Sequence, residues 1–352
     1  MTEIPNSHFT TLQGAYDVET MDATLRVRRY DPETQRSRFD TFTVTIPVTA
    51  SVLDALDAIK DQHDGTLSYR KSCRMAVCGS CGMRIDGGAA LACKTSMRKF
   101  VEAGHTITVS PMGNLPVIKD LVVDMAPFWQ KIRAVKPYLD TKGDESPDTE
   151  WRVTPQDAEL IHKESLCILC GCCVSECNSM ESDPDFLGPA ALAKAYRFVG
   201  DARDQDTRER LRDLNGAHGI WDCTRCYFCN QRCPKHVDPR DAIAKLGAES
   251  FKEGFTRDEG ARHAKVFVDS TFKGGYLRET ELVPKTIGPV NAIKDVPFAL
   301  QLARAGKVPN PLSPHKAKDN DEVKRLWKLL EKEAKEQPRR ATAKRPEAVQ
   351  GD

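Results

Sequence analysis

The chain has 352 residues, which is enough for two or three domains of ordinary size. Its 52 Lys and Arg residues are balanced by 51 Asp and Glu residues, and the formal net charge of +1 gives no field that would favour a nucleic-acid partner. No segment approaches the roughly 18 to 20 consecutive apolar residues that cross a bilayer, and the N-terminal residues lack a signal-peptide pattern. We therefore expect a cytoplasmic protein that does not itself span a membrane.

The first part of the chain carries strand signals around one helix signal. Alternating and β-branched residues predict strands at 24–31, 42–48 and 105–111. Residues 51–61 predict a helix, because Ser51 can cap its start while Asp54 occupies the capping-box position. This mixture indicates a small α+β sheet domain.

The later part of the chain loses the strand signals. Helices are predicted at 188–204 and 207–214, and a polar stretch at 141–150 is expected to be a linker. Near the end, an apolar stripe at helical spacing is formed by Val323, Leu326, Trp327 and Leu330. We expect an N-terminal segment at 1–23, followed by an α+β domain with its bridge at 24–140 and an α-helical domain at 151–250. A mostly helical extension at 251–336 and a disordered tail at 337–352 are expected to follow.

All 13 cysteines fall in three short regions, which favours metal ligation over disulfides in a chain without an export signal. The first region has the spacing C-x4-C-x2-C-x11-C and consists of Cys73, Cys78, Cys81 and Cys93. One tight loop with a fourth, later thiolate is typical of a plant-type [2Fe-2S] cluster. The alternative is a structural zinc site, but such sites usually contain two C-x2-C pairs.

The other two regions repeat the run C-x2-C-x2-C-x3-C. In two-cluster ferredoxins each run gives three ligands to its own cluster, and its fourth cysteine crosses to the other cluster. This rule predicts one cubane cluster on Cys167, Cys170, Cys173 and Cys233. It predicts a second on Cys177, Cys223, Cys226 and Cys229. Cys172 is left over, and we expect it to be a small buried packing residue.

Several stretches in order resemble the iron–sulfur subunit of succinate dehydrogenase and fumarate reductase over residues 24–247. They are "SCRMAVCGSCGMRIDGG", "LPVIKDLVVDMAPFW", "CILCGCC", "FLGPAALAKAYRF" and "CPKHVDPRDAI". The resemblance implies a β-grasp [2Fe-2S] domain beside a partner flavoprotein that carries FAD, followed by an α-helical domain with two further clusters. It also implies that succinate is oxidised on the flavoprotein and that this chain conducts electrons toward quinone. No dinucleotide fingerprint or acid/base constellation assigns a catalytic residue to this chain.

The chain departs from the family pattern in three places. Most members lack a cysteine at the position of Cys226 and hold a [3Fe-4S] cluster there, so its presence predicts a second [4Fe-4S] cluster, with [3Fe-4S] without Cys226 as the alternative. The segment 178–186 and Thr224 replace the tryptophan-rich segment and histidine that line the usual quinone site, which puts that site in doubt. Residues 263–282 are similar to a heterodisulfide-reductase subunit.

The resemblance therefore implies two kinds of partner. One is the FAD-containing flavoprotein. The other is a quinone-reactive subunit on the membrane side, and the similarity of residues 263–282 implies that this subunit is cysteine-rich and heterodisulfide-reductase-like. The complex is expected to be peripheral on the cytoplasmic face of the membrane. Two alternatives stay open: a fumarate reductase subunit that works in reverse, and a freestanding ferredoxin-like carrier or adaptor.

Overall fold

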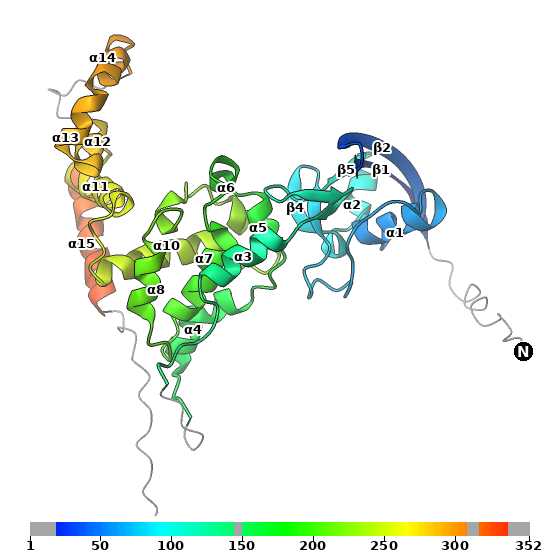
Figure 1. The fold of residues 1–352 in the computed structure, drawn as a ribbon, viewed down its shortest axis with the longest axis horizontal. Helices are drawn as coiled ribbons and strands as arrows, with labels where there is room; N and C mark the ends of the chain where they lie inside the picture. Colours follow the sequence, from blue (N-terminus) through cyan, green and yellow to red (C-terminus); the bar gives the residue numbers. More distant parts are fainter. Residues whose placement is uncertain (1–18, 144–149, 308–316, 337–352) are drawn as a thin grey trace, which may run out of the picture. The chain divides into compact units, whose positions relative to one another are not determined.

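A computed structural model describes residues 19–143, 150–307 and 317–336 (Figure 1). The predicted tail at 337–352 and most of the N-terminal segment and of the 141–150 linker lie outside these residues. The chain divides into two units, which are described separately. The first unit contains residues up to 128 together with 168–176 and 231–235, and the second contains 129–167, 177–230 and residues from 236 onward.

A five-stranded sheet organises the first unit. Its order is β2-β1-β5-β3-β4, and its strands are β1 (Thr20–Asp31), β2 (Arg36–Pro47), β3 (Gly82–Ile85), β4 (Gly88–Leu91) and β5 (Ile107–Ser110). β1 and β2 form a long antiparallel hairpin, whereas β1 and β5 run parallel. The three predicted strands are confirmed as β1, β2 and β5, but the glycine-containing hairpin β3–β4 was not predicted, since it is short and lacks alternation.

Helix α1 (Val52–Gln62) closes the core of the first unit. Both halves of the predicted capping box are present, because Ser51 accepts from the Asp54 N–H and the Asp54 carboxylate accepts from the Ser51 N–H. Leu53, Leu56 and Ile59 are buried in the same core as the sheet residues. Full burial of such a side chain contributes about 1.5 to 3 kcal/mol, so this face fixes α1 against the sheet.

Smaller elements complete the first unit. They are a 3-10 turn, two short helices, a two-stranded ribbon and the beginning of a helix: Ala92–Lys94, α2 (Arg98–Glu102), α5 (Cys172–Ser175), β6 (Val117–Lys119), β7 (Val122–Val123) and the start of α3 (Ala126–Ala134). Helix α5 packs on β3 and β4 although it lies far along the chain, and Cys172 belongs to the core of the sheet. The prediction that Cys172 is a buried packing residue is confirmed.

The second unit is helical throughout the residues that the structure describes. Its first helices are α4 (Pro155–Ser165), α6 (Asn178–Ser182), α7 (Gly188–Val199), α8 (Thr207–Leu214), α9 (Phe228–Gln231) and α10 (Pro239–Lys252). Helix α7 packs on α10, α4 and α8, so it forms the centre of this group. Helix α7 ends earlier than the predicted 188–204 because Gly200 caps it and Asp201 turns the chain, accepting from the Arg203 N–H.

The C-terminal extension is also helical, as predicted. It contains α11 (Glu259–Gly274), α12 (Glu279–Ile287), α13 (Pro289–Ala292), α14 (Val296–Arg304) and α15 (Asn320–Glu336). α15 packs on α11, where Trp327 meets Phe272 edge to face with ring centroids 6.3 Å apart. The predicted stripe is covered only in part, since Leu326 and Leu330 remain exposed.

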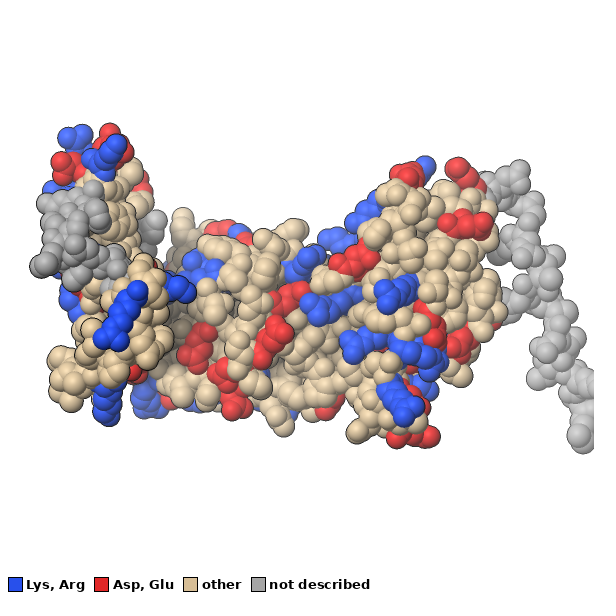
Figure 2. All heavy atoms as spheres, turned by 90° about the horizontal axis from the view of Figure 1, so that it is seen from above, with Lys and Arg blue, Asp and Glu red and all other residues tan. Residues whose placement is uncertain are grey.

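Two surface properties bear on function. Figure 2 shows basic and acidic side chains interspersed over the visible face, in keeping with the balanced composition. Among the described residues, no helix has the combination of length and apolarity that a membrane span requires.

Candidate metal centres

Backbone N–H groups surround the sulfur atoms of the first cysteine loop, which comprises Cys73, Cys78, Cys81 and Cys93. Cys73 Sγ accepts from the N–H groups of Val77 and Cys78, both at 3.3 Å. Cys93 Sγ accepts from the Ala76 N–H, also at 3.3 Å. Arg74, Ala76 and Gly79 have positive φ values of 57°, 56° and 76°, which turn successive N–H groups inward. The loop is therefore arranged to stabilise negative charge on sulfur, as a cluster requires.

Two members of this loop differ in environment. Cys78 is exposed, and hydrogen bonds from Ser80 and from the Cys73 N–H lower its pKa to about 6. Cys81 is buried, and desolvation raises its pKa to about 12. The loop thus presents one predicted ligand to the surface and anchors another in the sheet.

Three members of the middle cysteine group, Cys170, Cys173 and Cys233, lie in the first unit. Cys172 is close enough to all three to interact with their charge. Gly79 allows this arrangement, because a Cβ at that position would lie 2.8 Å from Cys170 Cβ. The first cysteine loop therefore packs directly on part of the middle group.

Cys167, the fourth predicted member of the middle group, ends the 129–167 segment of the second unit. It follows α4, and its N–H donates to the Glu164 carbonyl at 3.4 Å. Its place in the middle group remains a prediction from spacing.

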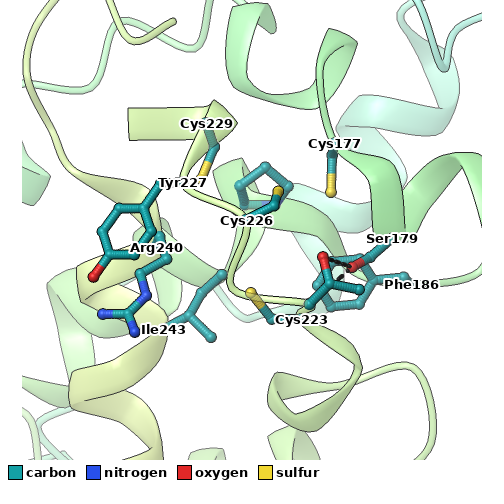
Figure 3. Close-up of a pocket in the computed structure, with 11 residues that line it drawn as sticks. Cys177, Ser179, Phe186, Cys223, Cys226, Tyr227, Cys229, Arg240 and Ile243 are labelled. Atoms are coloured by element: carbon teal, nitrogen blue, oxygen red, sulfur yellow. Dashed lines mark hydrogen bonds between the residues drawn. The ribbon is translucent and has the colours of Figure 1, made fainter. Parts of the chain in front are cut away.

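The third set forms a four-cysteine pocket in the second unit. Cys177 precedes α6, Cys223 follows a 3-10 turn at Ile220–Asp222, Cys226 lies in the next loop and Cys229 lies in α9. All four line a single small pocket. Figure 3 shows their sulfur atoms turned toward this space. The structure therefore brings together the four residues that the crossing rule groups.

Burial opposes free thiolates in this pocket. Desolvation raises the pKa of Cys177, Cys223 and Cys229, to about 12 for Cys229, and charge on the neighbouring cysteines raises it further. Cys229 is buried, Cys177 and Cys223 are half-buried and Cys226 is exposed. Four thiolates this close together, three of them at least partly desolvated, require a cation that compensates their charge. The chemistry of this donor set fits an iron–sulfur cluster.

The two cysteine runs share one backbone conformation. In the first run, Leu169 and Gly171 have positive φ values of 55° and 79°. In the second run, Arg225 and Tyr227 occupy the corresponding positions with φ values of 58° and 66°. Both runs therefore make the same turn, and Cys226 occupies in its run the position that Cys170 occupies in the first.

Other residues that line the four-cysteine pocket were not predicted as site residues. Thr224 donates its N–H to Ser179 Oγ at 3.1 Å, so two small polar residues occupy this wall. Arg240 enters from α10 and stacks on Tyr227, with its guanidinium carbon 4.4 Å from the ring centroid. No sequence signal distinguishes Arg240 from other surface arginines, because its place depends on the convergence of separate segments.

Two family models together cover all three cysteine regions. Residues 24–130 match the model of a 2Fe-2S iron-sulfur cluster binding domain. Residues 164–237 match the model of a 4Fe-4S dicluster domain. All three cysteine sets fall within these two ranges.

Similar proteins are found along most of the chain. The fumarate reductase iron–sulfur subunit of Haemophilus influenzae is 41% identical over 65% of this chain and 93% of its own length. The succinate dehydrogenase iron–sulfur subunit of Paracoccus denitrificans is 40% identical over 66% of this chain and 88% of its own. The 8-methylmenaquinol:fumarate reductase iron–sulfur subunit of Wolinella succinogenes is 38% identical over 74% of this chain and 83% of its own.

A solved structure shares the fold. A chain of the Mycobacterium smegmatis Sdh1 complex in the apo form superposes with a TM-score of 0.59 at 26% identity. The match covers 67% of this chain and 98% of that chain.

Proposed function

Because the chain belongs to the family of iron–sulfur subunits of succinate dehydrogenase and fumarate reductase, we propose that it conducts electrons within a succinate:quinone oxidoreductase. The chain takes electrons from the FAD of a partner flavoprotein and passes them toward quinone. One-electron transfer is the chemistry that iron–sulfur clusters supply when bound. The residues of this chain hold the clusters, exclude water from them and set their potentials.

Each cysteine set has one task in this proposal. The first cysteine loop holds a [2Fe-2S] cluster on Cys73, Cys78, Cys81 and Cys93. The middle group holds a [4Fe-4S] cluster on Cys167, Cys170, Cys173 and Cys233. The four-cysteine pocket holds the last cluster, on Cys177, Cys223, Cys226 and Cys229.

The last cluster is a second [4Fe-4S] cluster. The observation that carries this proposal is the position of Cys226, which lines the same pocket as the other three cysteines. The common turn of the two runs supports it, because Cys226 occupies the position of Cys170. A fourth thiolate adds negative charge and allows a fourth iron to be retained.

The family to which the chain belongs also indicates its partner subunits. A flavoprotein covers the electron-donating side, and a quinone-reactive subunit of the cysteine-rich, heterodisulfide-reductase type lies on the membrane side, at the cytoplasmic face. Co-purification tests these partners: native protein that brings down no flavoprotein would instead be a freestanding carrier.

Electron paramagnetic resonance on the native complex tests the last cluster. Iron content and spectra of the oxidised and reduced protein are compared with those of Cys226→Ser. We expect no three-iron signal in the oxidised native protein and a strong one in Cys226→Ser. Cys172→Ser is the matched control, since Cys172 is a neighbouring cysteine of the first run outside the ligand sets. A strong three-iron signal from undamaged native protein would contradict the proposal.

The direction of turnover is a separate question. Relatives named for fumarate reductase and for succinate dehydrogenase align at similar identities, 41% and 40%. A potential of the last cluster below that of the native quinone pool would favour electron transfer to quinone and hence succinate oxidation, and a higher one would favour electron transfer from quinol and hence fumarate reduction.

A further inference from the structure

Arg240 is a charged residue on the wall of the four-cysteine pocket that the ligand assignment does not use. It is the second residue of α10, and its side chain is 21% exposed. Figure 3 shows it beside Tyr227 and Ile243, on one side of the space that the four cysteines border. A guanidinium cannot shed its charge in proteins, so this wall carries a fixed positive charge.

The arginine is held in place from both ends. Its backbone N–H donates to Asn230 Oδ1 at 2.9 Å, and Nη1 donates to Asp241 Oδ1 at 3.1 Å. Its guanidinium lies over the Tyr227 ring. Asp241 is itself held by Asn230 Nδ2, 3.0 Å from the other carboxylate oxygen. These contacts restrict the side chain to the pocket wall.

One donor of this side chain has no acceptor. Arg240 Nε is buried, and no atom of the described residues accepts a hydrogen bond from it. A buried donor without a partner costs about 1 to 3 kcal/mol of stability. The Arg240 Nε–H is therefore expected to have a hydrogen-bond acceptor that does not belong to the polypeptide. The pocket next to it is bordered by sulfur, and the Arg240 charge acts on Cys223.

We propose that Arg240 donates its Nε–H to a sulfur atom of the cluster bound in the four-cysteine pocket and raises the reduction potential of that cluster. Reduction adds negative charge, and both a hydrogen bond to sulfur and a nearby positive charge stabilise the reduced form. Arg240 thereby offsets the negative charge that the fourth thiolate, Cys226, introduces. The inference rests on the proposed function, because it requires a cluster on these four cysteines.

Redox titration followed by electron paramagnetic resonance tests the role of Arg240 on the native complex. Arg240→Leu removes the charge and the donor, whereas Arg240→Lys keeps the charge and loses the planar Nε–H. We expect Arg240→Leu to change the equilibrium constant for one-electron reduction of the last cluster at least tenfold, a shift of about 59 mV to lower potential. Arg240→Lys is expected to shift it in the same direction by less.

The control is Arg208→Leu in the same unit. Arg208 also stacks on an aromatic ring, Phe255, at 5.1 Å, and hydrogen-bonds Glu253, but it does not line the pocket. It is expected to leave the last cluster unchanged, and the [2Fe-2S] potential serves as a reference in every sample.

The outcomes separate the two proposals. Native protein without a cluster on these cysteines, judged by iron content and spectra, overturns the proposed function. A cluster that is present but has the native potential in Arg240→Leu overturns the role of Arg240. Where Arg240→Leu does not assemble the cluster, Arg240→Lys decides: an unchanged or higher potential contradicts the proposal, and a lower one supports it.

Discussion

The first cysteine loop and the four-cysteine pocket share one means of holding sulfur and differ in another. In the loop, backbone N–H groups supply hydrogen bonds to Cys73 and Cys93, and Cys78 reaches the surface. In the pocket, burial raises the pKa of Cys177, Cys223 and Cys229 although backbone N–H groups also reach their sulfur atoms, and Arg240 adds positive charge from a side chain. Negative charge on sulfur is thus stabilised by the backbone in both places, and in the pocket a side chain contributes as well.

Because of this difference, the two sites are expected to be sensitive to different substitutions. A site built from backbone N–H groups depends on unusual φ values, so it is sensitive to a change at glycine. The pocket, whose turn also contains positive φ values, depends in addition on the stability of the surrounding helices and on the Arg240 side chain. Three substitutions test the contrast.

The largest effect is expected from Gly79→Ala in the first cysteine loop. Gly79 has a φ of 76°, and an added Cβ would lie 2.8 Å from Cys170 Cβ and 2.9 Å from Cys170 Cα. Because backbone would have to move, we expect loss of most of the [2Fe-2S] signal in electron paramagnetic resonance, while the signal of the last cluster remains. The loop conformation is unimportant if the [2Fe-2S] signal stays at full intensity.

The control for this substitution is Gly65→Ala in the same unit. An added Cβ there meets only the Lys60 carbonyl, at 3.9 Å. We expect native signals from every cluster.

An intermediate effect is expected from Asp201→Asn, which tests the helical support of the pocket. Asp201 follows α7 and is 1% exposed. Desolvation disfavours its charge, but hydrogen bonds from Arg203 and Arg197 outweigh this and lower its pKa to about 2. Since the pKa is lowered on folding, the stabilisation is present above about pH 4 and is lost as the pH falls through about 2. We expect the variant to lose roughly 2 kcal/mol of unfolding free energy at pH 7.

Urea unfolding at several pH values measures this loss. The difference between native protein and Asp201→Asn should be constant from about pH 5 to 8 and should shrink only below about pH 4. Asp269→Asn is the control, because Asp269 pairs with Lys265 on an exposed helix face and such pairs contribute little. Equal losses in the two variants would argue against a special role for Asp201.

The smallest effect is expected from Ser80→Ala. The Ser80 side chain is the first cause of the lowered pKa of Cys78, so the substitution removes one hydrogen bond to an exposed, proposed cluster ligand. We expect the reduction potential of the [2Fe-2S] cluster to fall by less than about 59 mV, which corresponds to a tenfold change in the equilibrium constant for one-electron reduction. The potential of the last cluster should stay unchanged. Ser72→Ala, at another exposed serine of the loop, should have no effect. A response of the last cluster would show that the two sites are not independent.

Sequence reasoning captured what depends on local spacing. The capping box of Ser51 and Asp54 lies within one turn, and the structure confirms it. The grouping of Cys177 with Cys223, Cys226 and Cys229 followed from a known crossing rule, and the structure brings these four residues together. Their roles as ligands stay a prediction.

Features that depend on convergence of distant segments could not be predicted in this way. Arg240 has an ordinary helix N-terminal context, and only the fold brings it to a cysteine pocket. The helix α5 packs on β3 and β4, which lie about 80 to 90 residues earlier in the chain, and no periodic pattern in the sequence predicts such a contact. Leu326 and Leu330 are exposed, which shows a further limit of prediction from sequence. Periodicity predicts that a helix has an apolar face, but it does not predict which segment packs on that face.

The return of residues 168–176 and 231–235 to the first unit has a consequence for biosynthesis. Domains commonly fold in order as the chain emerges from the ribosome, at about 5 to 20 residues per second. The first unit cannot complete its core in this way, because Cys172 is part of that core and is made only after the whole 129–167 segment of the second unit. Part of the sheet surface therefore stays uncovered until the later residues are made. A nascent chain released before residue 235 would expose the surface on which the middle cysteine group is built.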